Sequence, residues 1–161
     1  MNTLIPLARG VAERLRARAQ NLAVAESSAG GLISASLLAI PGASDYFLGG
    51  AVIYTVQARG GLLGLEASDL EGIRSASEPY AALLAGRLRQ RLGADWALAE
   101  SGASGPTGNR YGDAPGHAVL AVAGPVERVQ TLETGRDGRE DNMRAFAAAA
   151  LTLLTQCLDG G

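Results

Sequence analysis

The sequence predicts an α/β protein in which helices are layered on a mixed sheet. Segments whose apolar residues recur at helical spacing alternate along the chain with short apolar runs of strand length. Near the C-terminal end, two strand-like runs are separated only by the turn residues Gly124 and Pro125, which indicates a hairpin and so at least one antiparallel pair. The 161 residues are expected to form a single domain, residues 1–161.

Five segments are predicted to be helical. The first is amphipathic, because Leu4, Leu7, Val11 and Leu15 recur at helical spacing while charged residues occupy the other faces. Two others carry start signals: a serine precedes Glu-Pro at 78–79, and Asp137 with Glu140 resembles a capping box. The predicted helices cover residues 4–19, 32–39, 56–65, 78–92 and 140–157.

Five further segments are predicted to be strands, and two of them lead into glycine-rich loops. The strands cover residues 22–25, 47–55, 95–100, 117–123 and 126–133. The loops cover residues 26–31 and 101–116. Because open α/β sheets bind ligands beyond the carboxyl ends of their strands, both loops are candidate binding segments.

The composition excludes several kinds of chemistry. All 14 basic residues are arginine, and the chain has one histidine, His117, and one cysteine, Cys157. A Schiff-base lysine, a Walker A lysine and a Cys/His zinc cluster are therefore excluded, and neither metal nor cofactor is expected. A net charge of −2 with scattered arginines predicts no nucleic-acid partner.

The cellular setting is also an expectation from composition. One cysteine cannot form an internal disulfide, and the N-terminus lacks the pattern of a signal peptide, so a cytoplasmic location is expected. The longest apolar run, residues 145–154, is too short to span a bilayer, so no membrane association is expected.

The first loop has the features of an anion site. Gly30 and Gly31 leave backbone amides unobstructed at a predicted helix N-terminus, where the helix dipole favours negative charge. Ser27 would place a hydroxyl beside that site. The alternative interpretation is that Ser27 and Ser28 only cap the helix.

The second loop combines hydroxyl groups with bare backbone. Ser101, Gly102 and Gly105 lie in a run typical of phosphate cradles, although glycine there can equally serve tight turns. The dinucleotide fingerprint and the P-loop are both excluded, since the chain has no G-x-G and no lysine.

Several motifs, in order, resemble the family of the CinA C-terminal domain. The family signature A-E-S-C-T-G-G is similar to residues 25–31, and P-G-x-S-x-x-F-x-G-G is similar to residues 41–50. Further family blocks are similar to residues 54–64, 75–80 and 101–106, and to Gly138-Arg139 with Arg144 downstream. The resemblance covers nearly the whole chain and implies a three-layer α/β/α sandwich with a mixed, mainly parallel sheet. It also implies a stand-alone domain that forms dimers or higher assemblies.

The resemblance further implies an activity, because stand-alone members of this family are nicotinamide-nucleotide amidohydrolases. They hydrolyse the carboxamide of nicotinamide mononucleotide to nicotinate mononucleotide and ammonia. Ser27 would be the nucleophile, activated by Tyr54 and by the residue at the family's lysine position, which is Arg59 here. The expected substrate-binding residues are Glu26, Ser28, Gly30, Gly31, Ser101, Gly102, Gly105 and Arg139.

Arg59 leaves two interpretations open. Arginine stays protonated and cannot act as a base, although its charge can stabilise a serine alkoxide or a tyrosinate. Either weak turnover survives with Tyr54 or another group as base, or the domain only binds a nucleotide. A third interpretation is an interaction domain that pairs with itself or with a competence or recombination partner.

Glu100 and His117 are the new acid/base groups within the matched motifs. One hypothesis is that His117, polarised by Glu100, replaces the family lysine as the base. The alternative is that His117 is a partly exposed residue at a strand start with no partner.

Overall fold

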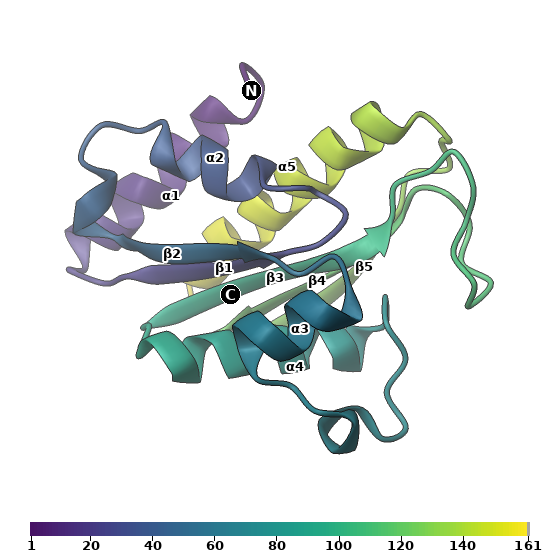
Figure 1. The fold of residues 1–161 in the computed structure, drawn as a ribbon. Coiled ribbons are helices and arrows are strands. Elements are labelled where there is room, and N and C mark those ends of the chain that lie inside the picture. The colour runs from purple at the N-terminus through teal and green to yellow at the C-terminus, as the bar shows by residue number, and fades with distance from the viewer. Residues whose placement is uncertain (161) are drawn as a thin grey trace.

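Five strands form one mixed sheet with the order β2-β1-β3-β4-β5 in the computed structural model, which describes residues 1–160 (Figure 1). β1 (Leu22–Glu26) lies parallel to both β2 (Phe47–Val52) and β3 (Trp96–Ala103). β4 (His117–Ala123) is antiparallel to β3, and β5 (Arg128–Glu133) is antiparallel to β4. Four strands therefore run in one direction and β4 alone is reversed.

Helices cover both faces of the sheet, which confirms the three-layer α/β/α architecture (Figure 1). One face carries α1 (Ile5–Ala17), α2 (Leu32–Leu38) and α5 (Arg139–Leu158), which share one apolar core with the sheet. The other face carries α3 (Val56–Leu63) and α4 (Glu78–Leu92). Two short 3₁₀ helices, η1 (Ala43–Asp45) and η2 (Ala67–Leu70), lie in connections.

Burial on both faces explains why the central strands are almost continuously apolar. All residues of β1 and β4 are buried, whereas the edge strand β5 has no fully buried residue. Side chains of a strand point alternately to the two faces, so Leu22 and Val24 enter the larger core and Ala23 and Ala25 enter the core under α4. The small alanines on that second face let α4 lie close to the sheet.

The helices follow the sequence prediction closely, but the strand predicted over 47–55 ends at Val52 and the strand predicted over 126–133 begins at Arg128. α5 begins after Gly138, which makes no side-chain capping bond, so the predicted capping box at Asp137 and Glu140 is wrong. The N-cap of α4 is confirmed, because Ser77 Oγ accepts a hydrogen bond from the backbone N–H of Tyr80.

A further correction concerns the start of the glycine-rich loop. β3 continues through Ser101, Gly102 and Ala103, which are strand residues rather than loop residues. Gly102 pairs with Ala118 of β4, and a Cβ on Gly102 would lie 2.8 Å from Ala118 Cα. Glycine is therefore required here by the close approach of two strands.

Candidate active site

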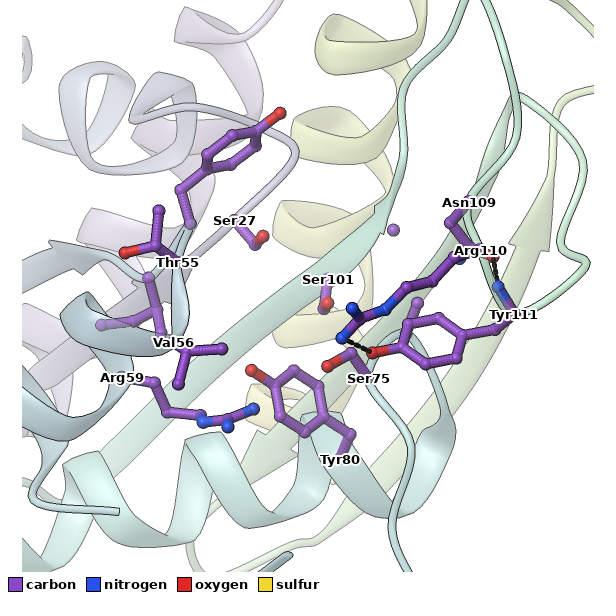
Figure 2. Close-up of a pocket in the computed structure, with 14 residues that line it drawn as sticks. Ser27, Thr55, Val56, Arg59, Ser75, Tyr80, Ser101, Asn109, Arg110 and Tyr111 are labelled. Atoms are coloured by element: carbon purple, nitrogen blue, oxygen red, sulfur yellow. Dashed lines mark hydrogen bonds between the residues drawn. The ribbon is translucent and has the colours of Figure 1, made fainter. Parts of the chain in front are cut away.

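A cavity of 310 Å³ opens at the carboxyl ends of β1, β2 and β3 (Figure 2). Ser27 lies directly after β1, and Tyr54 and Arg59 lie after β2, in the entry to α3 and in α3 itself. Ser101 of β3 faces the same space. The structure thus brings together the three residues expected to be catalytic, although they are separated by up to 32 positions in the chain.

Glu26 occupies the amides at the N-terminus of α2. Its Oε2 accepts hydrogen bonds from the N–H groups of Gly31 and Ile33, both at 3.0 Å. Its Oε1 accepts from the N–H of Ser34 at 2.8 Å and from its hydroxyl at 2.5 Å. A buried carboxylate and the unpaired amides of a first helical turn satisfy each other. The expectation of a bare anion site at this helix start is therefore wrong.

We expect Glu26→Gln to lower the free energy of unfolding by about 1–2 kcal/mol, because the NH₂ of the glutamine amide, itself a donor, must face backbone N–H donors. Urea denaturation followed by circular dichroism measures this. Glu71→Gln, at an exposed position, is the matched control and should unfold like the wild type. An unchanged midpoint for Glu26→Gln would contradict the prediction.

Glu100 holds the preceding part of the same turn. Its Oε2 accepts hydrogen bonds from the N–H groups of Ser27 at 3.0 Å and Ala29 at 2.8 Å. Its Oε1 is buried and has no partner among residues 1–160. Loss of hydration, together with the charge of Glu26, raises the pKa of Glu100 to about 7 in spite of the amide hydrogen bonds, which lower it.

These two carboxyl groups change the expected roles of the turn. The amides of Ser27 and Ala29 donate to Glu100, so they are not free to stabilise an oxyanion. Gly30 and Gly31, at φ +66° and +96°, donate their N–H groups to Ser27 O and to Glu26. Glu26, Gly30 and Gly31 do not line the Ser27 cavity or the adjoining cavity along the loop after β3. They stabilise the turn instead of contacting a ligand.

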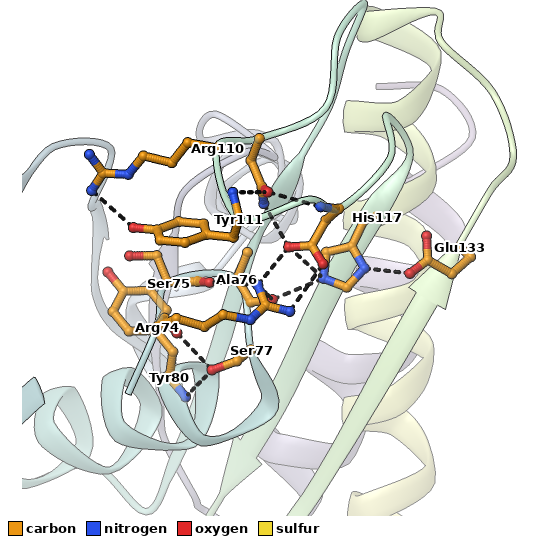
Figure 3. A network of polar contacts seen from close by, with 11 residues as sticks. Arg74, Ser75, Ala76, Ser77, Tyr80, Arg110, Tyr111, His117 and Glu133 are labelled. Atoms are coloured by element: carbon orange, nitrogen blue, oxygen red, sulfur yellow. Dashed lines mark hydrogen bonds and ion pairs between the residues drawn. The ribbon is translucent and has the colours of Figure 1, made fainter. Parts of the chain in front are cut away.

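His117 is not placed to act as a base for Ser27. Nδ1 contacts Glu133 and Nε2 lies 2.9 Å from the carbonyl oxygen of Ala76 (Figure 3). In the antiparallel register His117 faces Ala103, whereas Glu100 faces Leu120, so the two side chains do not meet. The hypothesis that Glu100 polarises His117 is wrong.

The alternative picture of an unpartnered histidine is also wrong, because the ring is buried and both nitrogens have partners. Burial alone would lower the pKa of His117, but its contacts with Glu133 and the Ala76 carbonyl and the charge of Asp113 outweigh burial and raise it. The imidazole of His117 on β4 therefore has a structural role, because it joins β5 to the segment before α4.

A second cavity of 240 Å³ adjoins the first along the loop after β3. Ser28, Gly105 and Arg139 line it, and Tyr54, Gly102 and Asn109 line both cavities. Arg139 donates to Gly105 O at 2.7 Å and to Tyr54 Oη at 3.1 Å. The structure therefore brings these expected substrate-binding residues together, with part of the Arg139 guanidinium already engaged.

Several lining residues of the first cavity were not found from the sequence. They are Ser75, Tyr80, Asn109, Arg110 and Tyr111. The sequence signal that could have indicated a binding role for Arg110 and Tyr111 is a basic residue next to an aromatic one inside a glycine-rich loop. Arg59 lies with its guanidinium carbon 6.0 Å from the centroid of the Tyr80 ring.

Two absences apply to the described part of the chain. Among residues 1–160, no helix has the length and apolar character needed to cross a bilayer. No group of three or more His, Cys, Asp or Glu side chains there is placed to hold a metal ion.

Comparisons with known proteins agree with the fold and the motifs. A model of the CinA C-terminal domain matches residues 4–158. A CinA-like protein of Prochlorococcus marinus (strain MIT 9313) is 42% identical over 119 residues, which are 74% of this chain and 28% of that protein. A CinA-like protein of Trichormus variabilis is 36% identical over 156 residues, which are 94% of this chain and 37% of that protein. The chain therefore spans only about a third of the length of these curated relatives.

Solved structures show the same architecture. A competence-damaged protein (CinA) superfamily protein from Klebsiella pneumoniae superposes with a TM-score of 0.91 at 26% identity, over 98% of this chain and 99% of that chain. A competence/damage inducible protein from Agrobacterium tumefaciens superposes with a TM-score of 0.86 at 28% identity, over 97% of this chain and 95% of that chain. Since the family model covers almost every residue, the chain belongs to the CinA C-terminal domain family.

Proposed function

We propose that this protein is an amidohydrolase that converts nicotinamide mononucleotide to nicotinate mononucleotide and ammonia, with Ser27 as the nucleophile. The observation that carries the proposal is the convergence of Ser27, Tyr54 and Arg59 on one cavity at the carboxyl ends of three strands. The family motifs around Ser27 and Tyr54 supply the reaction type.

The reaction would proceed through an acyl-enzyme. Ser27 Oγ attacks the carboxamide carbon while its proton passes to a base, for which the tyrosinate form of Tyr54, beside the guanidinium group of Arg139, is the candidate in this cavity. Collapse of the tetrahedral intermediate breaks the carbon–nitrogen bond, and the nitrogen leaves as ammonia after taking up the proton. Water then hydrolyses the acyl-serine to the carboxylic acid and restores the Ser27 hydroxyl.

The oxyanion requires a donor other than the turn amides, since those of Ser27 and Ala29 donate to Glu100. Arg59 lines the same cavity and stays protonated, so it accepts no proton, and its positive charge favours anionic groups of the ligand.

Ammonia release from nicotinamide mononucleotide by the purified protein tests the proposal. Release that depends on Ser27 supports it. Binding of the nucleotide, seen as a raised melting temperature without ammonia release, would instead favour a catalytically silent nucleotide-binding protein. The observation in favour of that second candidate is the combination of a permanently protonated Arg59 with turn amides that are already engaged.

Arg59→Lys is expected to raise kcat by about tenfold or more, because a lysine amine can take up a proton and a positioned base contributes about 10²- to 10⁴-fold. Steady-state ammonia release measures kcat. Arg9→Lys, on the exposed side of α1, is the matched control and should leave the rate unchanged. A decrease of kcat in Arg59→Lys would contradict the idea that only the base has been lost.

A further inference from the structure

The Ser27 cavity continues into a groove lined by arginine. A neighbouring cavity of 460 Å³ shares Val56, Arg59, Ser75, Arg110 and Tyr111 with it. Neither cavity is lined by an aspartate or a glutamate, so the positive charge of these arginines has no counterion within the lining. Arg139 lines neither of these two cavities and belongs to the loop cavity instead.

Arg59 and Arg110 are the two arginines of this groove without an acidic partner in the described part of the chain. The ion pairs there involve other residues, and Arg74 is paired with Asp113 at 2.7 Å. The Nε atom of Arg59 is buried and has no hydrogen-bond partner among residues 1–160. A buried donor on a cation costs free energy unless an acceptor reaches it, so Arg59 has hydrogen-bonding capacity that its protein neighbours do not use.

The loop that carries Arg110 is held in place rather than free. Asn109 Oδ1 accepts hydrogen bonds from the N–H groups of Tyr111 at 3.0 Å and Asp113 at 3.1 Å (Figure 3). Asp113 in turn binds Arg74 through two hydrogen bonds. These hydrogen bonds fix the loop that places Arg110 in the same cavity as Arg59.

Tyr111 contacts the guanidinium group of Arg110 in this groove (Figure 2). Arg110 donates to Tyr111 Oη at 3.0 Å, and its guanidinium carbon lies 5.1 Å from the ring centroid. Hydrogen bonds with Ser75 and Arg110, followed by the charges of Arg110 and Arg59, lower the pKa of this phenol. The two arginines, which line the same two cavities, therefore give this groove a positive charge.

We propose that Arg59 and Arg110, with Tyr111 and Ser75, bind a phosphate group of the ligand. The proposal rests on the proposed function for the identity of the ligand, a mononucleotide whose carboxamide lies at Ser27, but phosphate binding itself does not depend on catalysis. It gives Arg59 the role of an anion ligand and places the phosphate away from Arg139, whose guanidinium already donates to Gly105 and Tyr54.

Calorimetric titration with inorganic phosphate and with nicotinate mononucleotide, in phosphate-free buffer at low salt, tests this site. Arg110→Ala is expected to weaken binding of both probes about tenfold or more, and Arg110→Lys to restore part of it. Arg139→Ala and the exposed control Arg9→Ala are expected to bind inorganic phosphate like the wild type. Urea midpoints close to that of the wild type show that each variant is folded.

Three outcomes would overturn the phosphate site. They are failure of the wild type to bind inorganic phosphate at millimolar concentration, loss of binding in Arg139→Ala but not in Arg110→Ala, and equal loss in Arg9→Ala. The result is separable from catalysis. Phosphate binding that depends on Arg110 without ammonia release refutes only the proposed function, whereas ammonia release with an unchanged KM in Arg110→Ala refutes only the phosphate site.

Discussion

Ser27→Ala is expected to reduce ammonia release from nicotinamide mononucleotide by at least about 10³-fold, because it removes the oxygen that forms the acyl-enzyme. The variant should fold normally. The Ser27 backbone N–H, which donates to Glu100, is retained, and the side chain enters the cavity rather than the core. The assay is steady-state ammonia release at saturating nucleotide.

Ser68→Ala is the matched control, since Ser68 is exposed in η2 and lines neither the Ser27 cavity nor the loop cavity beside it. It should keep the wild-type rate. Equal rates for Ser27→Ala and the wild type would show that Ser27 is not the nucleophile. A raised melting temperature with nucleotide in both proteins would show that the pocket is intact in the variant.

Glu100 is expected to make the stability of the protein fall as the pH rises. Its pKa is raised from 4.5 to about 7 in the folded protein, so the folded state holds a proton that the unfolded state releases between these values. The contribution is fully present below the unfolded pKa and is lost as the pH passes through the folded pKa. One pKa unit corresponds to about 1.4 kcal/mol, so the loss amounts to about 3 kcal/mol in the free energy of unfolding.

Glu100→Gln removes this titration while keeping an oxygen that accepts from Ser27 and Ala29. Relative to the wild type, the variant should become more stable by about 3 kcal/mol as the pH rises from about 4 to about 8. Urea denaturation at several pH values measures the difference. Glu71→Gln, at an exposed position, should follow the wild-type curve. Parallel curves for Glu100→Gln and the wild type would show that Glu100 does not titrate in this range.

The charge of the Glu100 carboxyl group also affects the electrostatics at Ser27. Glu100 accepts from the N–H of the proposed nucleophile, so its charge lies directly beneath Ser27. A carboxylate there opposes the build-up of an oxyanion, whereas the neutral acid opposes it less. The charge of this one buried group therefore links the stability of the turn to the electrostatics at Ser27.

The regular elements were predictable because they depend on local patterns. The amphipathic spacing of α1 and the serine cap of α4 are properties of neighbouring residues, and both are confirmed. The loop after β3 begins three residues later than expected, because Gly102 allows β4 to pair closely where sequence alone suggests a turn. A glycine required by a neighbouring strand looks the same in a sequence as a glycine required by a turn.

The partners of the polar residues were not predictable in the same way. Alternation along a strand places Leu98 and Glu100 on one face, but it does not reveal that the turn after β1 covers Glu100. Likewise, His117 was an apparent candidate base until the antiparallel register set it opposite Ala103, where Glu133 and Ala76 reach its ring.

The sequence by itself determined the α/β/α architecture, the family and the position of Ser27 after the first strand, because periodicity and ordered motifs are carried by short segments. Only the tertiary structure decided which amides the two glutamates occupy and which arginines remain unpaired beside Ser27. Hydrogen bonds and charge pairs form between groups that the fold brings within about 3 Å, and the spacing of residues along the chain does not contain that distance.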